Sequence, residues 1–84
     1  MHELLISGQA ERDMKRLDAQ VFHRVAAEMS GLSANPRPAG CRKLSGPGRD
    51  WRIRVGDYRV IYEIDDAAKA VRIMRVRHRS EVYR

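Results

Sequence analysis

The segment WRIRVGDYRVIY, residues 51–62, constrains the fold of this chain more than any other part of it. Apolar and charged residues alternate as far as Gly56-Asp57, and β-branched and aromatic residues follow. This pattern predicts two antiparallel strands, at about 50–55 and 58–64. Gly56 suits the first central position of a two-residue turn, which requires positive φ. We therefore expect a β-hairpin.

A two-residue turn also predicts the register of this hairpin. It places Val55 opposite Tyr58, and the next pairs are Arg54 with Arg59, Ile53 with Val60 and Arg52 with Ile61. Side chains alternate between the faces of a strand, so one face is apolar, with Trp51, Ile53, Val55, Tyr58, Val60 and Tyr62 packed in the core. The other face gathers Arg52, Arg54 and Arg59. Directly opposed like charges destabilise a sheet by up to about 1 kcal/mol. We interpret the arginine face as a binding surface for an anion.

The first half of the chain predicts a short strand followed by two helices. Residues 2–6 form the strand, and Ser7 is placed to cap a helix over about 9–16. Asp18 is placed to cap a second helix over about 19–32. Both helices carry one apolar stripe at helical spacing. Its members are Ala10, Met14, Leu17, Val21, Val25, Met29 and Leu32.

The remaining segments are loops and short strands. Proline and glycine make residues 33–40 a loop, and residues 41–44 a short extended or turn piece. Residues 65–68 are a turn, and residues 70–77 alternate as a strand does. The chain is thus expected to be a single α+β domain, residues 1–84, with an N-terminal strand, a helical hairpin and antiparallel strands in a small twisted sheet.

Positive charge is concentrated in the second half of the chain. Residues 1–36 carry four Lys or Arg against five Asp or Glu, whereas residues 37–84 carry thirteen against six. Fourteen of the 17 cationic residues are arginine, whose planar fork binds phosphate oxygens in pairs and stacks on bases. Composition alone leaves both nucleic-acid binding and genomic base bias open.

Other features exclude several classes of protein. Cys41 is the only cysteine, so no internal disulfide can form and a reducing compartment is expected. The apolar run at residues 4–6 is far shorter than the ~20 residues that cross a bilayer, and no signal peptide is evident. We expect a cytoplasmic chain without membrane contact. No spacing of His, Asp or Cys resembles a metal site, and no cofactor is expected.

Three segments resemble the RelE/ParE superfamily of toxins from bacterial and archaeal toxin–antitoxin pairs, and its RelE branch in particular. They are KLSG at residues 43–46, the hairpin at 51–62 and VRHRSEVYR at 76–84. The order of predicted elements is also similar to the small barrel-like sheet and N-terminal helical hairpin of that family.

The resemblance implies a ribosome-dependent endoribonuclease that cleaves mRNA in the decoding site during translation, without a metal. The ribose 2′-hydroxyl attacks the adjacent phosphorus and leaves a 2′,3′-cyclic phosphate and a 5′-hydroxyl. Carried over by position, the predicted catalytic residues are Arg54, Arg59, Arg77, His78 and Tyr83. The predicted RNA-binding residues are Arg42, Lys43, Arg52, Arg54 and Arg79.

The general base for this reaction is left open by the sequence. Guanidinium groups can neutralise charge on phosphorus but, with a pKa above ~12, they cannot accept the proton. The RelE pattern has lysines where this chain has Arg52 and Arg54. Tyr83 is the first candidate because neighbouring arginines favour a phenolate, and His78 is the second because histidine titrates near neutrality. Positioning by the ribosome is a further source of rate.

Two alternative functions remain open from the sequence. A ParE-like toxin of the same fold inhibits DNA gyrase by binding and is not a nuclease, and a degenerate member binds RNA without toxicity. The HRSEVY run at residues 78–83 and the basic hairpin favour RelE, since ParE-like members generally lack them. Besides the ribosome and mRNA, the resemblance implies a cognate antitoxin and a hetero-oligomer. The expected antitoxin surface is the basic sheet face with exposed apolar positions of the helical hairpin.

Overall fold

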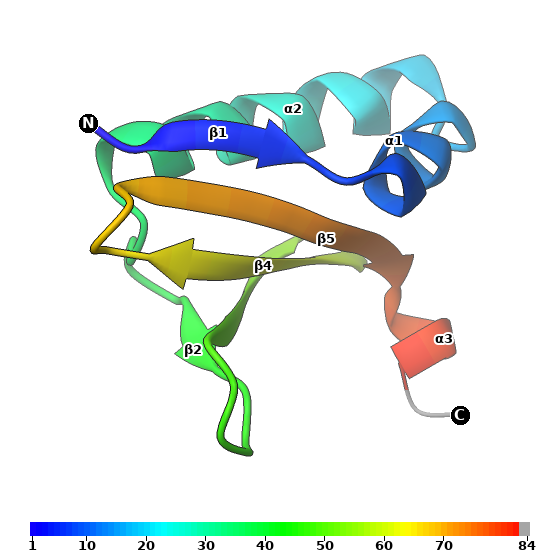
Figure 1. Cartoon of the computed structure of the whole chain (residues 1–84). Helices are drawn as coiled ribbons and strands as arrows, with labels where there is room; N and C mark the ends of the chain where they lie inside the picture. Colours follow the sequence, from blue (N-terminus) through cyan, green and yellow to red (C-terminus); the bar gives the residue numbers. More distant parts are fainter. Residues whose placement is uncertain (83–84) are drawn as a thin grey trace.

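The computed structural model describes residues 1–82 of the chain, as one sheet flanked by helices (Figure 1). Its elements in chain order are β1 (Glu3–Ile6), α1 (Gly8–Lys15), α2 (Ala19–Ala34), β2 (Arg42–Lys43), β3 (Asp50–Val55), β4 (Tyr58–Asp65), β5 (Ala70–His78) and α3 (Arg79–Val82). This order confirms the predicted α+β class. Tyr83 and Arg84 lie outside the described residues. None of the described helices is long and apolar enough to cross a bilayer.

The five described strands form an open sheet in the order β1-β5-β4-β3-β2. Strands β2 to β5 are antiparallel neighbours, and the β3–β4 register is the predicted one, with Val55 opposite Tyr58 and Arg54 opposite Arg59. Strand β1 instead runs parallel to β5 along the sheet edge. The helical hairpin makes this possible, because parallel neighbours require a long crossover connection. The sequence analysis predicted the strand but not this pairing.

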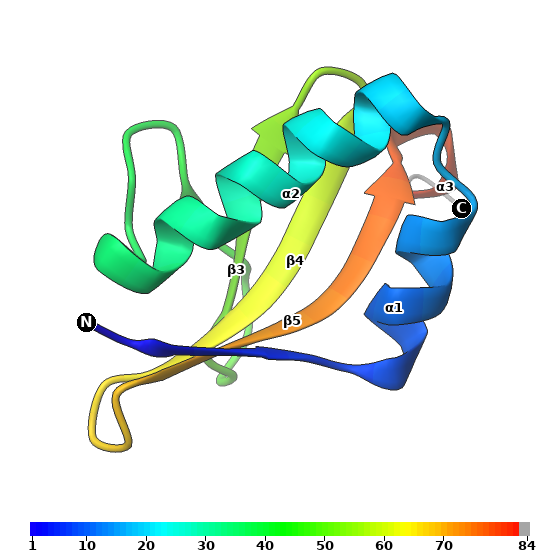
Figure 2. The same ribbon diagram turned by 90° about the horizontal axis from the view of Figure 1, so that it is seen from above.

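The helices cover one face of the sheet, and the core lies between them. Seen from above, α2 lies across the sheet while α1 sits beside the end of β5 (Figure 2). The predicted helical stripe is confirmed, and Leu17 and Val21 are its partly buried members. The buried apolar side chains are Ala10, Met14, Val25, Met29, Leu32, Ile53, Val55, Val60, Tyr62, Ile64, Val71, Ile73 and Val76. Burial raises the pKa of Tyr62, whose hydroxyl donates to the Pro36 carbonyl at 2.7 Å.

A β-bulge interrupts the pairing of β4 with β5 and changes which side chains face the core. Ile61 pairs with Arg75 but Tyr62 pairs with Ile73, so Met74 is an extra residue on β5. If Met74 were paired as a regular strand residue, strict alternation would place Arg75 and Arg77 on the same face as Val71 and Ile73. With Met74 bulged out, Val76 is buried in the core and Arg77 lies on the opposite face, beside Arg59.

Helix α1 binds the edge of β5 where β1 ends. The Ser7 hydroxyl donates to the Met74 carbonyl at 2.9 Å and accepts from the Ala10 amide at 3.1 Å, so it caps α1 as predicted. The Asp13 carboxylate accepts from the Val76 amide at 2.9 Å and from Arg75 Nε at 2.8 Å. Two side chains of one helical segment thus satisfy backbone groups on both sides of the bulge. Asp18 caps α2 by accepting from Val21, also as predicted.

We predict that Asp13 stabilises the fold through this contact. Burial alone raises the pKa of Asp13, but hydrogen bonds from Arg75 and the Val76 amide outweigh it and lower the pKa below its ordinary value. Asp13→Asn should reduce the free energy of unfolding by about 1–2 kcal/mol at neutral pH. Denaturant titrations of both proteins measure this difference.

The pH dependence of that difference checks its cause. A lowered pKa in the folded state gives stability that is fully present above the ordinary aspartate pKa and is lost as pH falls through the folded value. The curves of the two proteins should therefore converge below about pH 4. A difference that stays constant down to pH 2 would contradict an ionised contact.

Deletion of Met74 should be more damaging than its truncation. Deletion leaves Arg75, Val76 and Arg77 on their present faces, because Ile73 and Arg75 then alternate regularly, but it removes the carbonyl that the Ser7 hydroxyl binds and displaces α1 from the strand edge. We expect a loss of about 2–3 kcal/mol. Met74→Ala keeps the bulge and should cost less than about 1.5 kcal/mol. Thermal unfolding monitored by circular dichroism compares the two variants, and similar losses would show that the bulge is dispensable.

Candidate active site

Three arginines lie side by side across three neighbouring strands. The register places Arg54 of β3 opposite Arg59 of β4, and Arg59 opposite Arg77 of β5. Directly opposed residues in antiparallel strands have Cα atoms about 4.5–5.5 Å apart. Their side chains share the face opposite the helical layer, because Val60 and Val76 on the other face belong to the core. This set, the arginine row, concentrates three positive charges at one end of the sheet.

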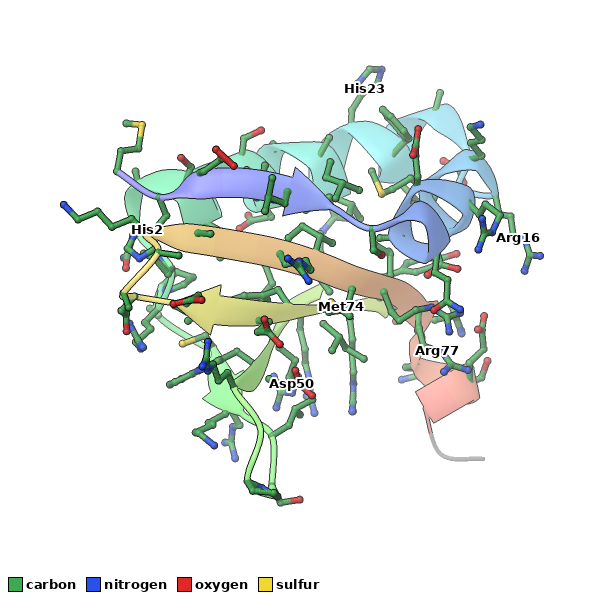
Figure 3. The ribbon with its side chains drawn as sticks, in the orientation of Figure 1. His2, Arg16, His23, Asp50, Met74 and Arg77 are labelled. Atoms are coloured by element: carbon green, nitrogen blue, oxygen red, sulfur yellow. The ribbon has the colours of Figure 1, made fainter. Side chains whose placement is uncertain are left out.

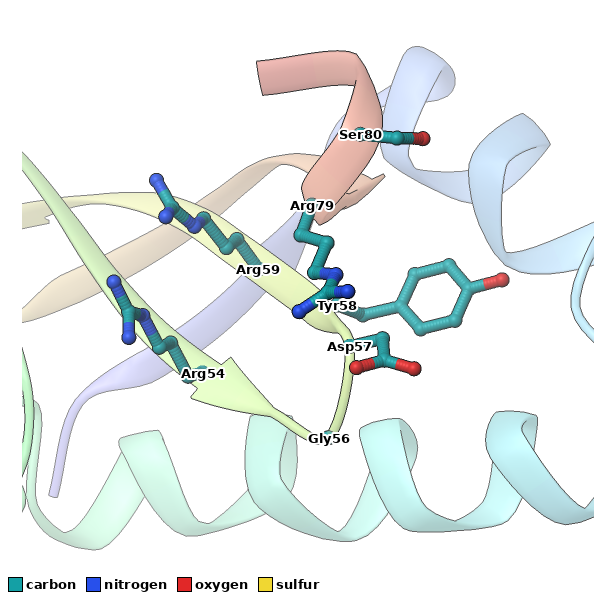
Figure 4. A pocket seen from close by; sticks show the side chains of 7 residues that line it. All are labelled: Arg54, Gly56, Asp57, Tyr58, Arg59, Arg79 and Ser80. Atoms are coloured by element: carbon teal, nitrogen blue, oxygen red, sulfur yellow. The ribbon is translucent and has the colours of Figure 1, made fainter. Parts of the chain in front are cut away.

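A cleft adjoins the arginine row at the tip of the β3–β4 hairpin. It has a volume of about 400 Å³ and is lined by Arg54, Gly56, Asp57, Tyr58, Arg59, Arg79 and Ser80. Arg54 and Arg59 project in the same direction from adjacent strands, while Arg79 extends from α3 toward the hairpin turn (Figure 4). The volume and charge of this cleft suit a phosphate-bearing group.

The hairpin turn and α3 are joined by backbone contact. Gly56 has φ of +60°, the positive value that its turn position was predicted to require. The Arg79 amide donates to the Asp57 carbonyl at 2.8 Å, which holds the first residue of α3 against the turn. Arg79 and Ser80 therefore reach the cleft because this helix packs there. The helix was not predicted, since four residues are too short for a periodic pattern.

Arg77 contributes a donor that the described residues leave unsatisfied. Its Nε atom is buried and makes no hydrogen bond within residues 1–82, and Glu81 Oε2 lies 3.6 Å away as an ion-pair partner. An unmet buried donor costs about 1–3 kcal/mol. The same residue lies near α3 at the end of β5 (Figure 3). An acceptor such as a phosphate oxygen would relieve that cost.

His78 is placed differently from the arginine row. It pairs with Tyr58, on the face opposite Arg59 and Arg77, and the two rings meet edge to face at 5.2 Å between centroids. Its Nδ1 accepts from the Ser80 amide at 3.2 Å and lies 2.9 Å from the Ser80 hydroxyl. A backbone amide can only donate, so the neutral ring carries its proton on Nε2 and its lone pair is occupied. His78 is thereby a donor, and it does not line the cleft.

The other predicted RNA-binding residues lie away from the cleft. Arg52 is 9% exposed, so little of its side chain is open to a ligand in this structure. It pairs with Ile61 of β4 and with Arg42 of the edge strand β2. Lys43 donates to the Gly48 carbonyl at 3.0 Å. Tyr83, the first candidate base, lies outside the described residues.

Asp57 and Ser80 are cleft residues that the sequence analysis did not single out. The sequence alone could have identified Asp57, because the predicted turn already placed that carboxylate at the tip of a basic hairpin. Ser80 required α3, for which the sequence carries no signal. Within residues 1–82, no group of three His, Cys, Asp or Glu side chains is arranged to hold a metal ion.

The known proteins that this chain is similar to are toxins of toxin–antitoxin systems. Residues 4–83 match the sequence profile of the ParE toxin of the type II toxin–antitoxin system parDE. Toxin RelG of Mycobacterium tuberculosis is 37% identical over 79 residues, which cover 89% of this chain and 87% of that protein. Toxin RelE of the same organism is 32% identical over 84 residues, 99% and 87% of the two chains.

A solved complex shows the same fold. The archaeal RelE–RelB complex from Pyrococcus horikoshii OT3 contains a chain that superposes with a TM-score of 0.83 at 28% identity, covering 93% of this chain and 94% of that one. Fold and sequence together define the class, a toxin of a type II toxin–antitoxin system. The chain belongs to the RelE/ParE superfamily of these toxins and to its RelE-like branch, which confirms the resemblance found in the sequence.

Proposed function

We propose that this toxin is a ribosome-dependent endoribonuclease that cleaves mRNA without a metal. The observation that carries the proposal is the arginine row beside a cleft large enough for a nucleotide phosphate. In the proposed reaction the ribose 2′-hydroxyl attacks the adjacent phosphorus and the 5′-oxygen leaves. The products are a 2′,3′-cyclic phosphate and a 5′-hydroxyl.

The arginines supply the electrostatic part of this reaction. Negative charge develops on the phosphorane oxygens, and fixed guanidinium donors stabilise that charge more than they stabilise the ground state. Arg54 and Arg59 reach the cleft from the sheet, and Arg79 reaches it from the opposite wall. Arg77 adds the buried Nε that has no hydrogen-bond acceptor within residues 1–82. The ribosome would position the message so that the attacking and leaving oxygens lie in line.

The gyrase alternative is not favoured by the comparisons. The similar curated proteins are named RelG and RelE, and the similar complex contains a RelE. A toxin that acts only by binding gyrase gains nothing from charges held together against repulsion in a cleft. The arginine row is therefore better explained by a phosphodiester substrate.

An antitoxin partner is part of the same proposal, because the similar archaeal toxin was solved bound to RelB. This chain offers an apolar groove of about 400 Å³ between β1 and the two helices. Ile6 is 48% exposed and Phe22 is 38% exposed there, beside Leu4, Met14 and Met29. We propose that the antitoxin inserts apolar side chains into this groove while an extended segment covers the basic face.

Arg54→Ala separates the catalytic role of the arginine row from a structural one. Removal of one donor to the transition state should reduce cleavage of mRNA on translating ribosomes by about 100-fold. Stability should be unchanged or up to about 1 kcal/mol higher, because a like-charge contact with Arg59 is removed. Arg12→Ala, on the exposed surface of α1, removes the same charge and serves as the control.

Primer extension on ribosome-bound mRNA measures cleavage, and thermal unfolding measures stability. A wild-type protein that leaves the message intact would refute the nuclease proposal, and gyrase-dependent DNA cleavage would support the alternative. A marked loss of stability in Arg54→Ala would show that this arginine is structural.

Phe22→Asp tests the antitoxin groove. A carboxylate in an apolar groove is not compensated, so affinity for the cognate antitoxin should fall at least tenfold. Cleavage should be unaffected, because Phe22 does not line the basic cleft. Ala27→Asp, exposed on the same helix but outside the groove, is the matched control. Calorimetric titration gives both affinities, and equal binding by the two variants would place the antitoxin elsewhere.

A further inference from the structure

One carboxylate stands in the basic cleft without a partner. Within residues 1–82, Asp57 is the one acidic side chain among the cleft-lining residues. Its carboxylate makes no hydrogen bond or ion pair with the described residues. The other carboxylates around this end of the sheet are engaged, Glu81 with Arg77 and Asp13 with Arg75. An unengaged acceptor in a cleft of donors is available to a ligand.

The position of Asp57 is held by three backbone features. Gly56 occupies the left-handed region that the turn requires, with φ of +60°. Tyr58 starts β4 directly after the turn, and the Arg79 amide binds the Asp57 carbonyl at 2.8 Å. Asp57 also lines a second, smaller cavity shared with Arg24 of α2. The backbone of the turn is therefore held between the start of β4 and the first residue of α3.

Arginines from four elements line the two cavities that Asp57 lines. Arg54 of β3, Arg59 of β4 and Arg79 of α3 line the cleft, and Arg24 of α2 lines the second cavity. Arg79 extends toward the turn, whereas Arg54 and Arg59 project away from it (Figure 4). A Cβ at Gly56 would lie 3.4 Å from Arg24 Nη1, which shows how closely that guanidinium covers the turn.

Among residues 1–82, the other groups at the site are poorly placed to accept a proton. The guanidinium groups stay protonated. The lone pair of His78 Nδ1 is occupied by Ser80, and His78 faces away from the arginine row. The Tyr58 ring points away from Arg54 and Arg59 (Figure 4).

We propose that Asp57 is the general base of the cleavage reaction, an inference that rests on the proposed nuclease function. An Asp57 carboxylate oxygen takes the proton of the 2′-hydroxyl as the O2′–P bond forms. The P–O5′ bond breaks, and the leaving oxygen takes a proton from water. Arg54, Arg59 and Arg79 stabilise the charge on phosphorus between these two events.

Asp57→Asn tests the role of Asp57 as the base with little disturbance of the fold, since asparagine is common in tight turns. We expect kcat on translating ribosomes to fall about 100-fold or more, with KM changed less than about threefold. Asp57→Glu should retain part of the activity. Glu28→Gln, exposed on α2, is the control for the change in charge.

Asp57→Asn cleaving at the wild-type rate would overturn the role of Asp57 and leave the nuclease proposal intact, whereas an inactive wild-type protein would overturn both. If Asp57→Asn unfolds at a lower temperature than wild type, Asp57→Ser provides the second variant, because serine is also common in turns. A folded Asp57→Ser with full activity would equally exclude the assignment.

Discussion

The site depends on a β-bulge that accommodates one extra residue in β5. Met74 shifts the alternation of that strand, so that Val76 enters the core while Arg77 joins Arg59 on the other face. The shift is held from outside the sheet, by the Ser7 hydroxyl at the Met74 carbonyl and the Asp13 carboxylate at the Val76 amide. A bulge near an active site commonly redirects a side chain in this way. Here it turns two neighbouring arginines into a row of three.

The arginine row is tolerated because the other face of the same strands is strongly stabilising. Val60, Tyr62 and Ile73 are fully buried beneath the helices. Full burial of each such side chain contributes about 1.5–3 kcal/mol, whereas each opposed pair of like charges costs up to about 1 kcal/mol. The sheet can therefore hold the guanidinium groups together on its other face. Their mutual repulsion is then available to be relieved when a phosphate binds.

The sequence predicted those parts of the fold whose signal is local. The hairpin register followed from a period of two and a glycine at the turn, and the helical stripe followed from a period of three to four. The bulge at Met74 could not be predicted, because residues 70–77 alternate plausibly without it and only α1 selects the shifted register. For the same reason Arg77 was assigned to the active face by family resemblance and not by its own strand pattern.

The surroundings of two predicted site residues could not be read from the sequence. Arg52 was grouped with Arg54 and Arg59 by alternation, but alternation does not reveal that Arg52 is buried beside the edge strand β2. His78 was proposed from its titration range, yet its contacts with Ser80 and Tyr58 depend on α3. In both cases the neighbours are distant in sequence or belong to an element too short to leave a pattern. The chemistry of a side chain depends on such neighbours more than the fold does, so it is harder to predict from residue type.

The Gly56-Asp57 turn links folding and chemistry in this protein. A tight turn after β3 is needed to bring Arg54 opposite Arg59, and polar residues such as aspartate are common in turns for backbone reasons alone. Once α3 packs on the turn through the Arg79 amide, that aspartate is enclosed in a basic cleft. A residue favoured by the turn thus also lines the cleft, where we propose that it accepts a proton. The contact that closes the cleft is the one that gives the turn its chemical role.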